Sequence, residues 1–174
     1  MEEVRSFGEE ITEKQKEYLA YISEHCSNVM RSYSILKERL KVFLGLSNQD
    51  MRMLYSNIVA HDLSKYTDEE FEAYRNNFYP EKGEEVNKEA FELAWQHHYR
   101  MNPHHWEHWV DFETGEAKQI PPLYIAELIC DWNAMSIKFG GTPLEFYNKK
   151  KETINLHPQT RKDLKRVLTL LYKD

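Results

Sequence analysis

The sequence has few of the residues that cross-link or interrupt a fold. It contains 2 cysteines, 6 glycines and 6 prolines among 174 residues. Two cysteines cannot form a disulfide framework. Because Cys26 and Cys130 both lie in apolar segments of helical period, we expect buried free thiols, although a single bridge between them stays open. No apolar run reaches the length of a membrane span, which argues against a transmembrane protein.

Positive charge is also scarce. The formal net charge is −6 at pH 7, whereas proteins that coat nucleic acids usually carry a basic face, so we expect no duplex nucleic-acid partner. A small anionic substrate held by a few local cations remains compatible with this charge. The segment Met1–Glu10 is acidic and lacks the basic and apolar regions of a signal peptide. We therefore expect a cytoplasmic protein.

Aromatic residues, in contrast, are plentiful. The 4 Trp, 11 Tyr and 8 Phe argue against disorder over most of the length. The length suits one domain, and no repeat or linker divides it. Apolar residues recur mainly at steps of three and four, and few runs are rich in β-branched residues. We predict one all-α domain over residues 1–174, a bundle of about six or seven helices with an irregular His- and Trp-rich insertion.

Caps and breakers give approximate bounds for these helices. Gly45 suits the C-terminal cap of the first helix, and Ser47 suits the N-cap of the second. Thr67 with Glu70 resembles a capping box for the third. The first predicted helix covers about residues 10–44, the second runs from after Ser47 to Asp62-Leu63, and the third from after Thr67 to Tyr79. The fourth covers about residues 88–100 and the fifth about residues 122–139. A sixth helix follows Thr142 and a last one follows Pro158. We expect residues 104–119 to be irregular, with a turn at Thr114-Gly115 and a short hairpin as one possibility.

Histidines and aspartates in three predicted helices suggest a metal site. His25 lies on the apolar stripe of the first helix, His61-Asp62 ends the second, and Asp131 flanks the buried stripe of the fifth. Imidazole and carboxylate are ordinary ligands of divalent ions. A buried aspartate needs a cation or several donors, and a metal would satisfy all four residues at once. Taken singly, each histidine also fits a hydrogen-bonded core residue, and each aspartate fits a helix cap or an ion pair.

The string Ala60-His61-Asp62-Leu63-Ser64-Lys65 resembles the signature of the HD superfamily of metal-dependent phosphohydrolases. In that family an upstream helix supplies a His, the His-Asp pair follows and a later helix supplies an Asp. The resemblance covers roughly residues 18–139 and implies metal ligation by His25, His61, Asp62 and Asp131. Ser64 stands where the family usually has Gly. The whole chain also resembles an uncharacterised family of phage and bacterial proteins, which implies no activity.

The resemblance leaves the number of metals open, since some HD proteins hold a second ion with histidines located between the pair and the last Asp. Five of the eight histidines lie between His97 and His108. Helical phase directs His98 rather than His97 inward. His104 and His105 follow a proline and can turn back to the same cavity. Because adjacent residues in an extended loop face opposite ways, we expect one of the two to ligate. The alternative is a histidine-rich substrate loop without a second metal.

A phosphohydrolase is the function that the resemblance favours. One or two divalent ions (Mn, Zn, Fe, Co or Mg) would activate water, and the substrate would be a small phosphate ester, a nucleotide first of all. Asp62 would ligate a metal and would also orient or deprotonate the water. Lys65 would pair with phosphate, and Glu107 would act as general acid or as a partner of a histidine. For Lys65 and Glu107 a solvated surface charge is the alternative.

Two other functions fit the same residues. Some HD-fold proteins use two irons held by a His, His-Asp, His, His, Asp pattern to activate oxygen, and this sequence allows that pattern. A nucleotide-binding protein without catalysis is the third hypothesis. The sequence leaves a homo-oligomer open.

Overall fold

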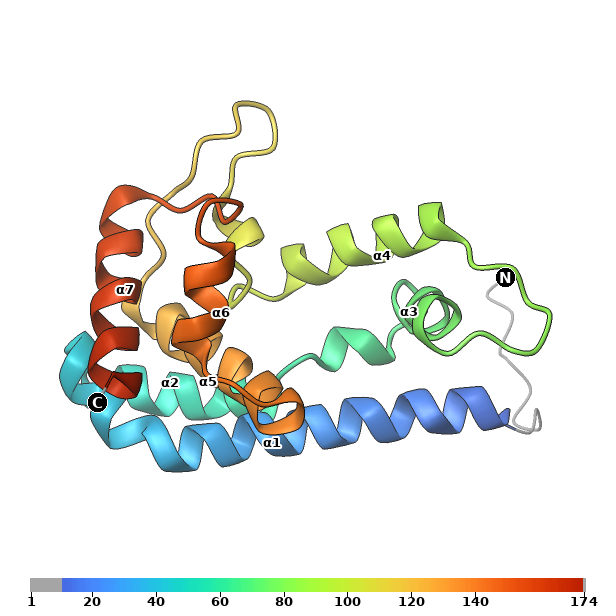
Figure 1. Cartoon of the computed structure of the whole chain (residues 1–174), viewed down its shortest axis with the longest axis horizontal. Coiled ribbons are helices and arrows are strands. Elements are labelled where there is room, and N and C mark those ends of the chain that lie inside the picture. Colours follow the sequence, from blue (N-terminus) through green and yellow to red (C-terminus); the bar gives the residue numbers. More distant parts are fainter. Residues whose placement is uncertain (1–10, 174) are drawn as a thin grey trace.

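A computed structural model describes residues 11–173, and within them the regular structure is helical (Figure 1). The α-helices are α1 (Glu13–Leu44), α2 (Asn48–Val59), α3 (Phe71–Phe78), α4 (Lys88–Met101), α5 (Pro122–Phe139), α6 (Pro143–Lys150) and α7 (Pro158–Tyr172). Two 3-10 helices are η1 (Leu63–Tyr66) and η2 (Trp106–Trp109). The prediction of an all-α fold of about six or seven helices is confirmed. The segment Met1–Glu10, including the expected start of the first helix, lies outside the described residues.

The long helix α1 packs against α2, α3, α5 and α7. Thr12 and Gln15 form a capping box at its start, and Gly45 ends it in the left-handed conformation at φ 64°, as predicted. The expected apolar stripe is buried from Tyr18 to Leu40. In Figure 1 this helix runs along one side of the molecule, and α5 makes the most extensive packing contact with it.

The buried apolar residues form two clusters along α1. The larger one joins α1, α2, α5, α6 and α7, and the smaller one joins α1, α3 and α4. Ile22 belongs to the smaller cluster and Val29 to the larger one. His25 lies between them on the same face of α1, so the candidate ligands are located where the two clusters meet.

Three local predictions differ from the structure. Thr67 and Glu70 form no capping box, because α3 begins only at Phe71 and the Glu70 carboxylate instead contacts two histidines of α4. The second helix ends at Val59, short of Asp62-Leu63. Phe139 was expected on the buried stripe of α5 but is 67% exposed, because it stands at the last turn of the helix, beside a cavity.

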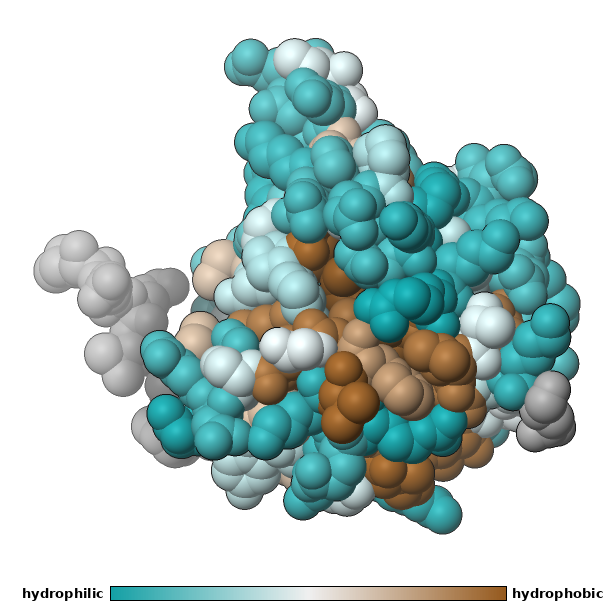
Figure 2. Space-filling model, turned by 90° about the vertical axis from the view of Figure 1, so that its left-hand side faces the viewer, coloured by the Kyte–Doolittle hydropathy of each residue, from teal (hydrophilic) through white to brown (hydrophobic). Residues whose placement is uncertain are grey.

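The segment between α4 and α5 is irregular, as predicted. It contains η2 and one isolated antiparallel bridge between Val110 and Ala117, which flanks the turn at Gly115. Cys26 and Cys130 are free thiols, as expected, but only Cys130 is buried, whereas Cys26 is half-buried. Within residues 11–173, no helix combines the length and apolar character that crossing a membrane requires. Figure 2 shows a largely hydrophilic face on which hydrophobic residues gather in one area.

Candidate metal centre

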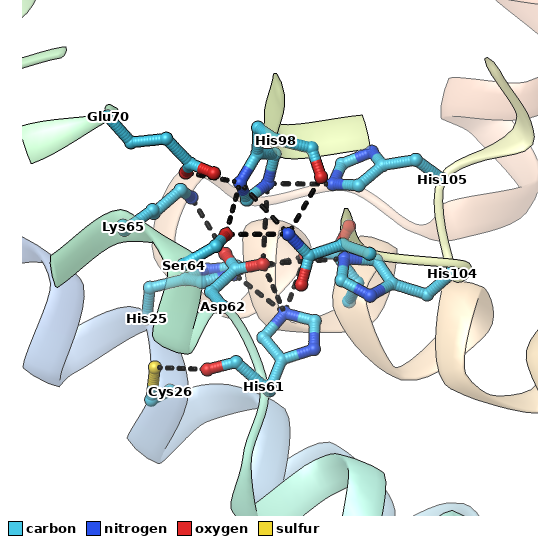
Figure 3. A network of polar contacts seen from close by, with 12 residues as sticks. His25, Cys26, His61, Asp62, Ser64, Lys65, Glu70, His98, His104 and His105 are labelled. Carbon is cyan, nitrogen blue, oxygen red and sulfur yellow. Dashed lines mark hydrogen bonds and ion pairs between the residues drawn. The ribbon is translucent and has the colours of Figure 1, made fainter. Parts of the chain in front are cut away.

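The structure brings the predicted ligands from separate parts of the chain into one cluster (Figure 3). His25 comes from α1, His98 from α4 and Asp131 from α5. His61 and Asp62 lie in the turn between α2 and η1, while His104 and His105 lie between α4 and η2. Of these seven residues, five are buried: His25, His61, Asp62, His98 and His104.

Four residues form what we call the first ligand group: His25, His61, Asp62 and Asp131. The Nε2 atoms of His25 and His61 lie 3.3 Å apart. Asp131 Oδ1 lies 3.1 Å from His25 Nε2 and 3.7 Å from His61 Nε2. Asp62 also contacts both histidines, with Oδ2 3.5 Å from His25 Nε2 and Oδ1 3.6 Å from His61 Nε2. The residues predicted to hold one metal therefore face one another through their ligand atoms.

The second ligand group consists of His98, His104, His105 and again Asp62. Asp62 Oδ1 lies 3.4 Å from His98 Nε2 and 3.5 Å from His104 Nε2. His105 Nε2 lies 3.0 Å from His98 Nε2. Together these four residues present ligand atoms within 4.8 Å of one another. Asp62 thus faces both groups and is the residue that they share.

Both His104 and His105 join the second group, whereas only one was expected. The expectation assumed an extended loop, but the chain turns there, with His105 N–H bonded to Asn102 O at 3.0 Å just before η2. His98 points inward and His97 does not, as helical phase predicted. His97 Nδ1 instead contacts Glu70 at 2.8 Å, and its side chain is 33% exposed. His108 Nδ1 contacts the Tyr99 carbonyl oxygen at 3.1 Å and stays outside both groups.

The spacing of these atoms fits a bound divalent ion. With ligand bonds of about 2.1 Å, neighbouring ligand atoms are about 3.0 Å apart in octahedral and about 3.4 Å apart in tetrahedral coordination. The shorter separations in the two groups, from 3.0 to 3.7 Å, fall around these values, while the second group as a whole spans up to 4.8 Å. Asp62 Oδ1 and His104 Nε2 are also buried without any hydrogen-bond partner. Such orphaned polar atoms are costly in a protein interior unless a cation satisfies them.

Asp62 reaches its position through an unusual backbone conformation. Its φ is 58°, and it is the only non-glycine residue with a positive φ among residues 11–173. Aspartate tolerates the left-handed region better than most residues, and strain of this kind gathers at functional sites. This conformation separates α2 from η1. The Lys65 N–H then donates a hydrogen bond to Asp62 O at 2.9 Å. The turn leaves the Asp62 carboxylate 1% exposed at the centre of the cluster.

Two buried glutamates contact the histidines, and neither role was predicted from the sequence. Glu127 Oε1 lies 3.5 Å from His61 Nδ1 and 3.2 Å from His104 Nδ1. Glu70 Oε2 lies 2.8 Å from His98 Nδ1. A carboxylate that accepts the Nδ1–H of a histidine fixes Nε2 as the free ligand atom. Glu127 had a detectable signal, because it is a charge in the apolar run of α5, one turn before Asp131.

The charges in the cluster stabilise one another strongly. Burial opposes ionisation of Asp62 and Asp131, yet His61 beside both, Lys65 beside Asp62 and His25 beside Asp131 hold both pKa values well below the ordinary range. Burial would lower the pKa of His61, but Asp62, Asp131 and Glu127 outweigh burial and raise it. For His105, burial and the neighbouring His104 and His98 lower the pKa well below its ordinary value. The two aspartates are therefore anionic ligands at neutral pH.

Lys65 and Glu107 both border the cluster. Lys65 Nζ pairs with Asp62 Oδ2 at 2.7 Å, so it neutralises a carboxylate oxygen of the cluster and is no solvated surface lysine. Burial disfavours its charge, but Asp62 outweighs this and raises its pKa. Glu107 has a buried oxygen without a hydrogen-bond partner, and burial raises its pKa to about 7. The catalytic roles given to Asp62, Lys65 and Glu107 stay predictions.

Both ligand groups open into a cavity of about 690 Å³. Its lining includes the candidate ligands His25, Asp62, His98, His104, His105 and Asp131. Apolar and aromatic residues of α5 and α6 also line it, among them Trp132, Met135, Phe139 and Phe146. Lys149 and Lys150 stand on the α6 side. A volume in this range admits a small organic molecule.

A comparison with known protein families matches residues 14–170. The chain belongs to DUF5662, a family of unknown function. The ligands of both groups, from His25 to Asp131, fall within the part of this DUF5662 chain that is matched. The comparisons give no link to the HD superfamily, so that resemblance stays a prediction. Curated proteins and solved structures yield no match to this DUF5662 member.

Proposed function

We propose that this chain is a metal-dependent phosphohydrolase with a centre for two divalent ions. The observation that carries the proposal is the pair of ligand groups that share the buried Asp62 and open into one cavity. Imidazole and carboxylate donors suit Mn, Fe, Co and Zn. Such ions, when bound, lower the pKa of water and neutralise charge on a phosphoryl group. The order of His25, His61-Asp62 and Asp131 in the chain also resembles that of HD phosphohydrolases.

The residues around the centre would have different roles in the reaction. Asp62, held rigidly by its turn and by Lys65, orients a water molecule between the two groups. Lys65 remains a cation in the cavity lining and would add positive charge beside a phosphoryl oxygen of the substrate. Glu107 offers an unpartnered carboxyl oxygen in the cavity wall to a hydroxyl or a leaving oxygen of the substrate. The volume suits a phosphate ester of nucleotide size.

The test is turnover of a panel of phosphate esters. Protein loaded with Mn²⁺, Co²⁺, Zn²⁺ or Mg²⁺ is incubated with nucleotides, sugar phosphates and aryl phosphates, and released phosphate is measured. We expect turnover of at least one ester and a loss of at least 100-fold in Asp62→Ala. Asp163→Ala on α7, outside the cavity lining, is the control and should keep full activity. No turnover with any metal and ester would refute the hydrolase.

An oxygen-activating enzyme is the second candidate. The five histidines and two aspartates of the two groups form a donor set that also suits a pair of irons. Its test is the iron content of protein purified without added metal, together with oxygen uptake in the presence of a reductant and candidate substrates. Two irons per chain with substrate-dependent oxygen uptake would favour this candidate. A colourless protein loaded with zinc or manganese would exclude it.

A further inference from the structure

Glu127 is a buried charged residue to which the proposed reaction gives no role. It lies on α5, one turn before Asp131, and is 4% exposed. Burial disfavours its anionic form, but the contacts with His104 and His61 outweigh burial and lower its pKa to about 2. A buried carboxylate is retained at such cost only when it is paired. Its partners therefore indicate its role.

The two oxygens of Glu127 have different partners. Oε2 accepts a hydrogen bond from Asn57 Nδ2 on α2 at 2.9 Å, which holds the carboxylate in place. Oε1 lies 3.2 Å from His104 Nδ1 and 3.5 Å from His61 Nδ1. His61 belongs to the first ligand group and His104 to the second. One oxygen atom thus contacts one imidazole of each group, and the two rings stack with centroids 4.2 Å apart.

This arrangement has a consequence for both metal positions. An imidazole whose Nδ1–H donates to a carboxylate presents its Nε2 lone pair, and the negative charge makes that nitrogen a stronger ligand. Loss of such a carboxylate typically costs about 10- to 100-fold in metal affinity. Because Glu127 contacts a ligand of each group, its loss acts on both positions. Glu70 is the natural contrast, since its ligand contact is with His98 of the second group only.

We propose that Glu127 is a positioning residue that couples the two metal positions by fixing His61 and His104 together. The inference rests on the two-ion centre of the proposed function. It goes beyond that function because it assigns to one carboxylate an effect on the metal affinity of both positions. Asn57 already holds the Glu127 carboxylate in place. An ion held through either histidine would fix this carboxylate further, and the other position would then have a histidine that is already oriented.

The experiment compares Co²⁺ binding by the full chain and three variants, using calorimetry and metal analysis. Wild type should bind two ions. Glu127→Gln, which keeps the shape but removes the charge, should weaken both positions at least 10-fold. Glu70→Gln should weaken one position and leave the other within a factor of two. Asn57→Ala, which removes the hydrogen bond to Oε2 but leaves both histidine contacts of Oε1, should keep two ions and weaken them less than Glu127→Gln does. Weakening of one position or none in Glu127→Gln, or fewer than two ions in wild type, would overturn the inference.

A second measurement does not depend on whether Glu127→Gln folds. Nitrogen-15 chemical shifts of the metal-free wild type report which ring nitrogen carries the proton. Protons on Nδ1 of both His61 and His104 are expected. A neutral His104 with its proton on Nε2 would overturn the inference. This inference and the proposed hydrolase activity can fail separately. If the protein binds two ions and depends on Glu127 for both but hydrolyses no ester, only the hydrolase activity is refuted.

Discussion

Asp62 Oδ1 and His104 Nε2 lie 3.5 Å apart, and both atoms are buried without a hydrogen-bond partner. An unsatisfied buried polar atom costs roughly 1–3 kcal/mol. The two atoms come from turns that precede η1 and η2, and each turn is held by backbone hydrogen bonds. A divalent ion would satisfy both atoms at once, which is why this pair points more directly to a metal than any single residue does.

Replacement of Asp62 by alanine should empty both positions. The carboxylate faces both ligand groups, so its loss removes a ligand from each. We expect metal analysis after gel filtration to find two ions in wild type and fewer than one in Asp62→Ala. His25→Ala removes a ligand from the first group only and should retain one ion. Two ions in Asp62→Ala would contradict the shared role of this residue.

Removal of metal should destabilise the fold. An ion that binds only the folded chain adds RT ln(1 + [L]/Kd), about 2.7 kcal/mol for each site at a free concentration of 100 times Kd. The ligands connect α1, α4 and α5, so we expect a chelator to lower the thermal unfolding midpoint and added Mn²⁺ or Zn²⁺ to restore it. The same additions should leave the midpoint of Asp62→Ala unchanged. An unchanged midpoint in wild type would argue against a metal centre.

Packing between α1 and α5 should dominate stability. Ile129 is 0% exposed in the larger apolar cluster on α5, the helix that also carries Asp131. Ile129→Ala leaves a cavity and should cost about 2–5 kcal/mol of unfolding free energy. Leu93→Ala, at a side chain that is 62% exposed, should change it by less than about 0.5 kcal/mol. Urea unfolding measures both, and equal effects would contradict the packing described here.

The aromatic wall of the cavity should contribute to substrate binding. Phe146 packs edge-on against Trp132, with ring centroids 4.9 Å apart, and both line the cavity. Under the proposed function, Phe146→Ala should raise KM for esters with a planar ring about 3- to 10-fold, because an aromatic pair contributes about 0.5–1.5 kcal/mol. The kcat should change less. Phe112→Ala, at a residue that is 82% exposed and outside the cavity lining, is the matched control.

The pairing of Arg75 with Glu84 should make stability depend on pH. Arg75 Nη1 lies 2.6 Å from Glu84 Oε2, and this contact lowers the pKa of Glu84 from about 4.5 to about 2. A carboxyl with a depressed folded-state pKa stabilises the fold above its ordinary pKa and loses that effect as the pH falls towards the folded-state value. Glu84→Gln should therefore be less stable than wild type at pH 7, and the difference should shrink below about pH 4.5. Chemical unfolding at several pH values measures this, and a constant difference would count against the pair.

The sequence by itself determined the class of fold and the inward direction of two ligands. Apolar spacing at three and four residues predicted α1 and α4, and the same spacing placed His25 and His98 on their buried faces. Gly45 and Ser47 mark the ends of helices because capping is local chemistry, decided by a residue and its next few neighbours. The sequence also singled out the His61-Asp62 pair, but it placed the pair at the end of the second helix, whereas the structure has it in a turn after Val59.

Only the tertiary structure decided how many ligands meet and which carboxylates support them. Glu127 meets His61 and His104 because α2, α5 and the loop after α4 converge, a contact between distant segments that no local pattern encodes. Glu70 resembled a helix cap in the sequence, but its partner His98 comes from another helix. His104 and His105 both face the cluster because the loop turns instead of extending, and that turn depends on packing around it. Local propensities fix helices and caps, whereas a site built from several elements depends on how those elements pack.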